Sequence, residues 1–210
     1  MYWSLPLPVW NTTQVASRQP LPATAYAILG LLSFGRELTG YELKQWADDS
    51  LRFFYTAPAM SQIYTELERL HDAGLVLDRV VQDGNRTIRS YRLSARGAAA
   101  LRTWAAETRP EPPVLKHHLA LRLFLGHLVE PERLVEQVRA HRTWLEHMLT
   151  ELADVRDDLA HDDPDTWRYA RLVAAWGRRY YESEAAAMDE LLAELSLLPV
   201  SRSLENLPGS

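Results

Sequence analysis

The chain has 210 residues, of which 47% are hydrophobic and 24% charged, and this composition is typical of a folded globular protein. It contains no cysteine, which excludes disulfides, thiolate metal sites and a cysteine nucleophile. The net charge of -5 is divided unevenly: residues 1–109 hold 12 Lys and Arg against 10 Asp and Glu, whereas residues 110–210 hold 11 against 18.

The two ends of the chain show no regular pattern. Residues 1–20 contain several prolines, and we expect an irregular arm that is either disordered or packed on a partner subunit through Trp3 and Trp10. Residues 199–210 are expected to form an irregular tail. The arm lacks the basic start and long apolar run of a secretory signal, and no stretch reaches the roughly 18 apolar residues that span a membrane. We therefore expect a cytoplasmic protein with no membrane partner.

Two helices are predicted between residues 23 and 51. The first, over residues 23–34, is compact and apolar, and Gly35 ends it in the way that glycine often follows a helix C-terminus. The second begins at Thr39, whose spacing to Glu42 is that of a capping box, in which each side chain accepts the backbone N–H of the other residue. The pair is separated from the next helix by three aromatic residues, Phe53, Phe54 and Tyr55.

A third helix is predicted from near Pro58 to Gly74. Its apolar residues recur at steps of three and four, which indicates a buried stripe of Met60, Ile63, Leu67 and Leu70. The opposite face is the one that a ligand would meet, and it holds Ser61, Gln62, Tyr64, Thr65 and Arg69. The alternative is an ordinary solvated helix face, with Tyr64 partly in the core.

The segment after this helix alternates apolar and polar residues twice, in LVLDRVV and TIRSYRL, with Asp83-Gly84 between the runs. An Asp-Gly pair in that position is typical of a β-hairpin. The hairpin is basic, because residues 79–102 hold six arginines against one acidic residue. Ser94 then caps a fourth helix, which the proline-rich residues 109–113 terminate. A helix running into a basic hairpin is the pattern of a winged helix-turn-helix DNA-binding domain, which we predict over residues 21–109.

Such a domain meets DNA with two parts. On the third helix, Gln62 suits the paired donor and acceptor on an adenine edge, and the hydroxyl groups beside it suit bases or phosphate. On the hairpin, Arg86 and Arg89 are candidates for phosphate contact, which gives affinity and salt dependence without sequence information. An arginine-rich hairpin also keeps an edge strand soluble, and this is the alternative reading.

Residues 110–198 are predicted to form a helical dimerisation domain, so the fold class is mainly α. A short helix over residues 114–125 precedes two long ones, which begin at Pro131 and at Asp163-Pro164. The first long helix has a heptad seam, and two amphipathic helices of this length cannot easily cover their own apolar stripes. We therefore expect a homodimer whose interface includes Leu145, Met148, Leu152, Val173, Trp176 and Tyr180.

Other candidate sites are weaker. Trp104 on the fourth helix could line an effector pocket, since flat aromatic faces suit planar apolar ligands, although ordinary core packing is the alternative. Among the seven histidines, His117 and His118 are adjacent and so point about 100 degrees apart on a helix, which keeps them from sharing an ion. His141 lies on the heptad seam and is expected to be structural. We predict no metal, no cofactor and no enzymatic activity, because no phosphate loop, metal triad or nucleophile motif is present.

The segments LPATAYAILGLLSFGRELTGYELKQ, SQIYTELERLHDAGLV and SYRLSARGAAAL resemble the PadR family of bacterial transcriptional regulators, in particular members with a helical C-terminal domain. Ser94 stands where that family usually has Thr. The resemblance implies a dimeric repressor that binds double-stranded DNA at an inverted repeat and releases it when a small hydrophobic or phenolic effector binds.

Two alternatives stay open. One is a winged-helix module that binds a protein instead of DNA, which salt dependence would distinguish. The other is the MarR type of architecture, in which the dimer helices come from both chain ends; here nearly all the additional helix is C-terminal.

Overall fold

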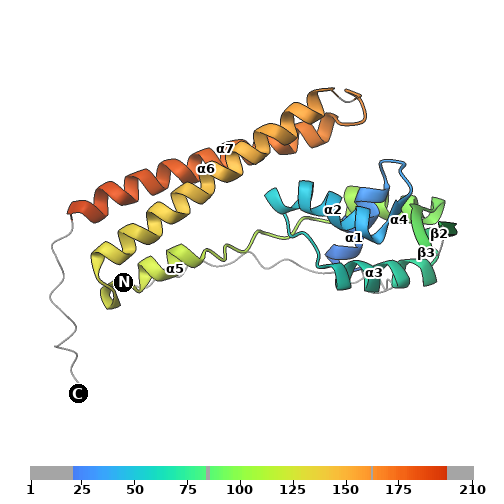
Figure 1. The fold of residues 1–210 in the computed structure, drawn as a ribbon, viewed down its shortest axis with the longest axis horizontal. Helices are drawn as coiled ribbons and strands as arrows, with labels where there is room; N and C mark the ends of the chain where they lie inside the picture. The colour runs from blue at the N-terminus through green and yellow to red at the C-terminus, as the bar shows by residue number, and fades with distance from the viewer. Residues whose placement is uncertain (1–20, 84–85, 162, 198–210) are drawn as a thin grey trace, which may run out of the picture.

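The computed structural model describes residues 21–83, 86–161 and 163–197, so the predicted arm and tail lie outside the described residues. The chain forms a winged-helix unit and a long helical hairpin, joined by an extended segment and a short helix (Figure 1). The winged-helix unit contains α1 (Ala23–Leu32), α2 (Gly40–Ser50), α3 (Met60–Asp72), α4 (Ala95–Glu107) and a sheet of β1 (Leu38–Thr39), β2 (Val76–Asp83) and β3 (Arg86–Leu93). The remainder contains α5 (His118–Phe124), α6 (Pro131–His161) and α7 (Arg168–Leu197), with short 3-10 turns η1 (Leu51–Phe53) and η2 (Gly126–Leu128).

Local signals set the helix boundaries of the winged-helix unit. The predicted capping box is confirmed: the Glu42 backbone N–H donates to Thr39 Oγ1 over 3.2 Å, and the Thr39 backbone N–H donates to Glu42 Oε2 over 2.7 Å. Gly35 and Gly74 follow α1 and α3 with φ values of 79° and 67°, a left-handed conformation that side chains disfavour. These glycines therefore stop the two helices where the sequence predicted.

The sheet has the strand order β1-β3-β2 with antiparallel neighbours. The predicted hairpin is confirmed, with Val76 opposite Leu93 at its base and Asp83 opposite Arg86 at its tip. The two-residue strand β1 was not predicted, because Leu38 and Thr39 are too few to show an alternating pattern. It adds a third strand by pairing Leu38 with Tyr91.

A buried core holds α3 against the other helices of this unit. Ile63, Leu67 and Leu70 of the predicted stripe are at most 1% exposed, whereas Met60 at the helix start is only partly buried. They pack with apolar residues of α1, α2 and the sheet, among them Ile28, Leu29, Leu43, Val76 and Tyr91. Because one side of α3 is buried in this way, its opposite side faces outward.

The helices α6 and α7 pack against each other as an antiparallel pair (Figure 1). The heptad seam is buried, but its partner is α7 of the same chain. Leu145, Met148 and Leu152 are 0%, 7% and 4% exposed within a single chain, so their assignment to a dimer interface is corrected. The reason is geometric: α7 runs back along α6 after the turn at residues 164–167 and covers the seam that the sequence alone would leave uncovered.

The starts of two helices also differ from the prediction. The helix expected over residues 114–125 is shorter and begins at His118, with the extended residues 108–117 before it. The last helix begins at Arg168, because Asp163 accepts hydrogen bonds from the backbone and hydroxyl of Thr166 and so caps a preceding turn. No helix among the described residues is long and apolar enough to cross a membrane.

The two units touch through the η1 turn. Arg52 donates two hydrogen bonds to the Glu151 carboxylate, each of 3.0 Å, and the Tyr181 hydroxyl donates to the Phe53 carbonyl oxygen over 3.0 Å. Phe53 itself is buried in the core of the helical hairpin. These contacts fix one side of a cavity that lies between the units.

Candidate DNA-binding face and apolar cavity

The outward side of α3 holds all five residues predicted to meet a ligand. Ser61, Gln62, Tyr64, Thr65 and Arg69 are exposed. The Tyr64 ring lies against the start of α2, since a Cβ added at Gly40 would be 2.6 Å from its Cε1. One side of the Tyr64 ring therefore packs against α2, and 46% of the residue stays exposed.

Two of these side chains have local partners. Gln62 Oε1 accepts a 2.9 Å hydrogen bond from the Ala59 backbone N–H, which caps the start of α3, and its amide nitrogen is left to donate outward. Thr65 Oγ1 donates over 2.9 Å to the Ser61 carbonyl oxygen of the preceding turn. A contact of Gln62 with adenine through both amide atoms therefore makes Oε1 accept a second hydrogen bond or release the cap.

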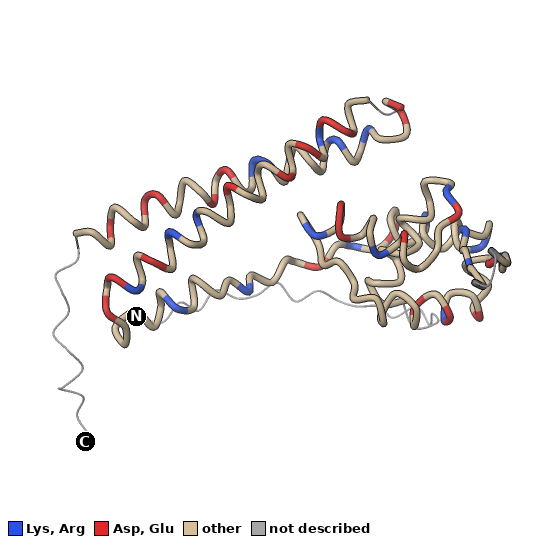
Figure 2. The backbone as a smooth tube through the Cα atoms, in the orientation of Figure 1, with Lys and Arg blue, Asp and Glu red and all other residues tan. Residues whose placement is uncertain are grey.

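The charge on α3 is concentrated in its second half. Glu66, Glu68 and Asp72 all lie there, whereas its first turns hold no charged residue. Figure 2 shows the charged positions of the chain in blue and red along the backbone. Arg69 Nη2 lies 3.5 Å from Glu66 Oε2, which partly neutralises that end. The first half of α3 also has the positive end of the helix dipole. An anionic partner is thus favoured at the N-terminal half of α3.

On the hairpin, Arg89 is held by a partner that the sequence did not reveal. Its Nε donates over 2.7 Å to Asp78 Oδ2 on the neighbouring strand, and Asp78 Oδ1 lies 3.0 Å from His71 Nε2. The hydrogen bond from Arg89 holds the pKa of Asp78 below its ordinary value. A phosphate contact by Arg89 therefore competes with Asp78. The side chain of Arg86 lies outside the described residues.

A cavity of about 490 Å³ lies between the two units. Its walls come from α1, α2, η1 and α4 on one side and from α6, α7 and the turn before α7 on the other. Two stacked ring pairs line it: Tyr26 with Trp104 at a centroid distance of 4.4 Å, and Phe34 with Trp167 at 4.5 Å. The predicted pocket residue Trp104 thus lies in the wall of a cavity large enough for a small ligand.

The described residues that line this cavity include no charged side chain. The hydroxyls of Ser33 and Ser50 each donate to a carbonyl oxygen one helical turn earlier. The polar side-chain groups of the other lining residues are tyrosine hydroxyls and tryptophan indole N–H groups, those of Tyr26, Tyr55, Tyr169, Trp46, Trp104 and Trp167. The wall residues come from six elements far apart in the sequence. Two of these residues, Leu152 and Val173, were predicted at a dimer interface instead. The cavity therefore suits an uncharged aromatic molecule with at most a few polar groups.

The other predicted interface residues lie on the exposed side of α7. Val173, Trp176 and Tyr180 are 36%, 53% and 45% exposed, and the rings of Trp176 and Tyr180 stack at 5.7 Å. Val173 also lines the cavity. A further group, His117, His141 and Glu184, lies on the helical hairpin away from α3 and has donor atoms close enough to hold a metal ion. Sequence reasoning missed it because its members are on three elements.

The fold and the outward face of α3 define a winged helix-turn-helix protein of the DNA-binding type. Residues 28–103 match the Transcriptional regulator PadR-like family, and residues 115–196 match the family Virulence activator alpha C-term. The winged-helix unit thus has the sequence features of the PadR-like family of transcriptional regulators, and the chain is similar in fold to PadR structures. The resemblance inferred from its sequence is thereby confirmed.

Known relatives agree with this assignment. The chain is 35% identical over 100 residues to the negative transcriptional regulator PadR of Bacillus subtilis, and the match covers 47% of this chain and 54% of that protein. It is similar to the crystal structure of Bacillus subtilis PadR in complex with operator DNA, with a TM-score of 0.70, 25% identity, and coverage of 82% and 98% of the two chains. The Bacillus subtilis PadR complex with p-coumaric acid is similar in fold, with a TM-score of 0.64, 23% identity, and coverage of 86% and 99% of the two chains.

Proposed function

We propose that this protein is a repressor that binds an inverted-repeat DNA operator as a homodimer and is released by a small, uncharged aromatic effector in the cavity. The observation that supports it most is the exposed, uncharged first half of α3 beside a basic hairpin, in a winged-helix unit that matches the PadR-like family. In this arrangement Ser61, Gln62, Tyr64 and Thr65 enter the major groove, while Arg86, Arg89 and Arg69 contact phosphates.

The homodimer is supported by apolar surface that one chain leaves uncovered. On α7, Tyr169, Leu172 and Trp176 are 72%, 61% and 53% exposed, and on α5 the most exposed apolar residue is Phe124 at 80%. Exposed apolar residues grouped in this way mark interaction sites in soluble proteins. A two-fold dimer formed here presents two copies of α3, which requires an operator with two half-sites about 34 Å apart or a multiple of that distance.

The effector step is supported by the position of the cavity. A ligand that touches Trp104 of α4 and Val173 of α7 contacts both units at once, so it binds best in one arrangement of the two. A ligand shifts the equilibrium between two arrangements only by its difference in affinity for them. Because the wall is uncharged, we expect an uncharged ligand here, although the similar Bacillus subtilis protein is known in complex with an organic acid, p-coumaric acid.

The test of DNA binding is a selection from a random duplex pool with the purified full chain. We expect an inverted repeat to be enriched, and two protomers to bind each duplex. An Arg86→Ala, Arg89→Ala double variant should bind the enriched duplex more weakly, and by a similar factor for duplexes of other sequence, because phosphate contacts do not read bases. If no sequence is enriched and binding is insensitive to salt, the surface binds a protein partner instead.

Replacing Asp78 with asparagine should strengthen DNA binding. Asp78→Asn removes the carboxylate that holds Arg89, so the guanidinium becomes available to a phosphate, and the plot of log affinity against log salt should steepen by about one. Asp189→Asn is the matched control, since Asp189 also accepts from an arginine Nε, that of Arg142, and its loss changes the net charge equally. Equal affinities and slopes for both variants would show that Arg89 does not reach the DNA.

Replacing Trp104 with alanine should weaken ligand binding in the cavity. We expect pyrene, an uncharged planar probe, to quench tryptophan fluorescence and to bind Trp104→Ala at least about tenfold more weakly, since an aromatic stack and its buried area are lost. Trp144→Ala serves as control, because Trp144 lies outside the cavity and stacks on His141. p-Coumarate should bind less tightly than pyrene, because its carboxylate would be buried without a cation. Tighter binding of p-coumarate would contradict the assignment of an uncharged effector.

A further inference from the structure

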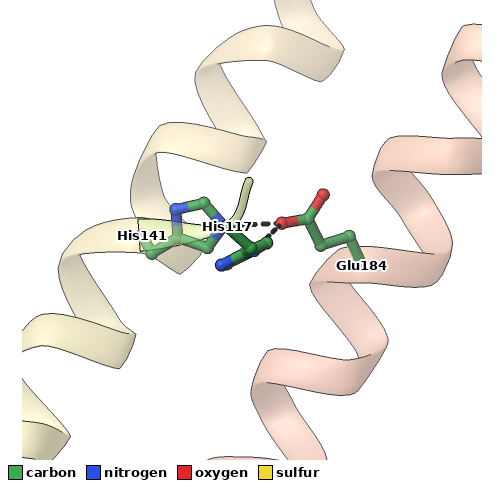
Figure 3. A group of neighbouring side chains, drawn as sticks. All are labelled: His117, His141 and Glu184. Carbon is green, nitrogen blue, oxygen red and sulfur yellow. Dashed lines mark hydrogen bonds and ion pairs between the residues drawn. The ribbon is translucent and has the colours of Figure 1, made fainter. Parts of the chain in front are cut away.

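Three side chains from three elements meet on the helical hairpin, at the end of the linker from the winged-helix unit (Figure 3). His117 is the residue before α5, His141 lies in the first half of α6, and Glu184 lies on α7. Both imidazole Nε2 atoms point at the same carboxylate oxygen, Glu184 Oε1, at 2.8 Å from His117 and 2.7 Å from His141. Their side chains are only 15–22% exposed.

We propose that His117, His141 and Glu184 bind a divalent transition-metal ion, with Zn²⁺ as the best fit, and leave one coordination position open. The three donor atoms lie within 4.8 Å of one another. A tetrahedral ion with bonds of about 2.0 Å separates its ligand atoms by about 3.3 Å, so each of the two nitrogens needs to move only about half an ångström away from Glu184 Oε1. This proposal is independent of DNA binding.

The chemistry of the three groups selects the class of ion. Two imidazole nitrogens and one carboxylate oxygen suit Zn²⁺ and its neighbours, whereas Ca²⁺ and Mg²⁺ require oxygen ligands. Glu184 is available as an anion: burial raises its pKa, but the hydrogen bonds from His141 and His117 outweigh this and hold the pKa below its ordinary value. A negative ligand therefore faces both nitrogens.

The surroundings hold the rings in place. The His141 ring stacks on Trp144 at a centroid distance of 5.3 Å, and the Trp144 ring meets Tyr181 edge-on at 6.0 Å. The other ring nitrogen of His117, Nδ1, accepts a 3.1 Å hydrogen bond from the Ala120 backbone N–H. In this arrangement the proton of His117 is on Nε2, so a metal ion that binds Nε2 requires this proton to move to Nδ1 of the same ring, and the hydrogen bond from the Ala120 N–H is then lost.

A bound ion would join the start of α5 to both long helices. The extended residues 108–117 lead from α4 to this point, and His117 is their last residue. The ion would therefore fix the far end of the linker on the helical hairpin and stabilise that unit, in addition to the apolar contact of Leu119 with its core. The protein would thus respond to a metal ion in addition to a ligand in the cavity, and the two would bind at separate sites.

The test measures Zn²⁺ binding to the chelator-stripped full chain by titration calorimetry, with His117→Ala, His141→Ala and Glu184→Gln as variants. We expect one tightly bound ion per chain and an affinity for Zn²⁺ more than about 100-fold lower in each variant. This loss is larger than the loss caused by replacing a residue that only orients a metal ligand. His118→Ala is the matched control: this neighbouring histidine is exposed and outside the group. Excess Zn²⁺ should raise the melting temperature of the wild type and His118→Ala by about 5 °C and leave the three variants unchanged.

Circular dichroism without metal shows whether each variant folds. If one does not, a second measurement on the wild type alone still tests the site. Co²⁺ in the intact wild-type chain should give the intense visible absorption of a four-coordinate ion, which Zn²⁺ abolishes. The proposal is overturned if the wild type binds no stoichiometric Zn²⁺, if Co²⁺ shows only the weak spectrum of a six-coordinate ion, or if His118→Ala loses as much affinity as His117→Ala.

Discussion

A glutamate at position 65 is expected to lower the affinity for the operator duplex at least about 100-fold. Thr65 lies on the exposed, uncharged half of α3, so Thr65→Glu places a carboxylate against the phosphates and base edges, and like charges brought together across an interface cost several kcal/mol. The fold should be unaffected, because glutamate favours helices more than threonine does and can pair with Arg69 one turn later. Fluorescence anisotropy with the selected duplex measures the loss.

The control for this variant is Thr150→Glu. Thr150 is exposed on α6, and its Oγ1 donates to the Glu146 carbonyl oxygen one turn earlier, as Thr65 Oγ1 does to Ser61. Both variants change the net charge equally, but only Thr65→Glu changes the outward face of α3. If the two lose affinity to the same small extent, α3 does not enter the groove.

Gly97→Ala is expected to destabilise the winged-helix unit by about 3 kcal/mol or more. Gly97 lies in the first turn of α4, where a Cβ would be 2.0 Å from the Leu75 carbonyl oxygen and 3.0 Å from the Leu75 carbonyl carbon. These are backbone atoms and cannot rotate away, so α4 must separate from the start of β2. Ser94 Oγ, which accepts from the Gly97 N–H over 2.9 Å and lies 2.8 Å from the Gly74 carbonyl oxygen, would be displaced too. Urea unfolding measures the free energy.

Gly30→Ala provides the comparison for this variant. Gly30 is also a helical glycine, but a Cβ there would meet nothing within 4 Å. Alanine favours a helix over glycine by roughly 0.5–1 kcal/mol, so this variant should be as stable as the wild type or slightly more so. A loss for Gly97→Ala no larger than that for Gly30→Ala would contradict the close approach of α4 to β2.

Features that depend on neighbouring residues could be predicted from the sequence. The Thr39–Glu42 capping box, the helix ends at Gly35 and Gly74 and the hairpin around Asp83-Gly84 each involve a few consecutive residues. The buried stripe of α3 follows from helical periodicity, which also predicts the opposite face. For this reason the winged-helix unit and its outward residues were found without a structure.

Features that depend on long-range pairing could not be predicted. The heptad seam of α6 shows that an apolar partner exists, but not that α7 of the same chain is that partner, and so Leu145 was wrongly placed between subunits. The Arg89–Asp78 bond depends on strand register, and the His117–His141–Glu184 group depends on how three helical elements meet. Periodicity contains no information about any of these distances.

Binding of the selected duplex across a salt series tests the central claim most directly. For a dimer that makes six or more phosphate contacts, the logarithm of the affinity should fall linearly with the logarithm of the salt concentration, by about 1,000-fold or more between roughly 50 and 200 mM. Two protomers should bind each inverted repeat. An affinity that is independent of salt, or equal for the selected duplex and a scrambled one at every salt concentration, would contradict the claim that this winged helix reads DNA.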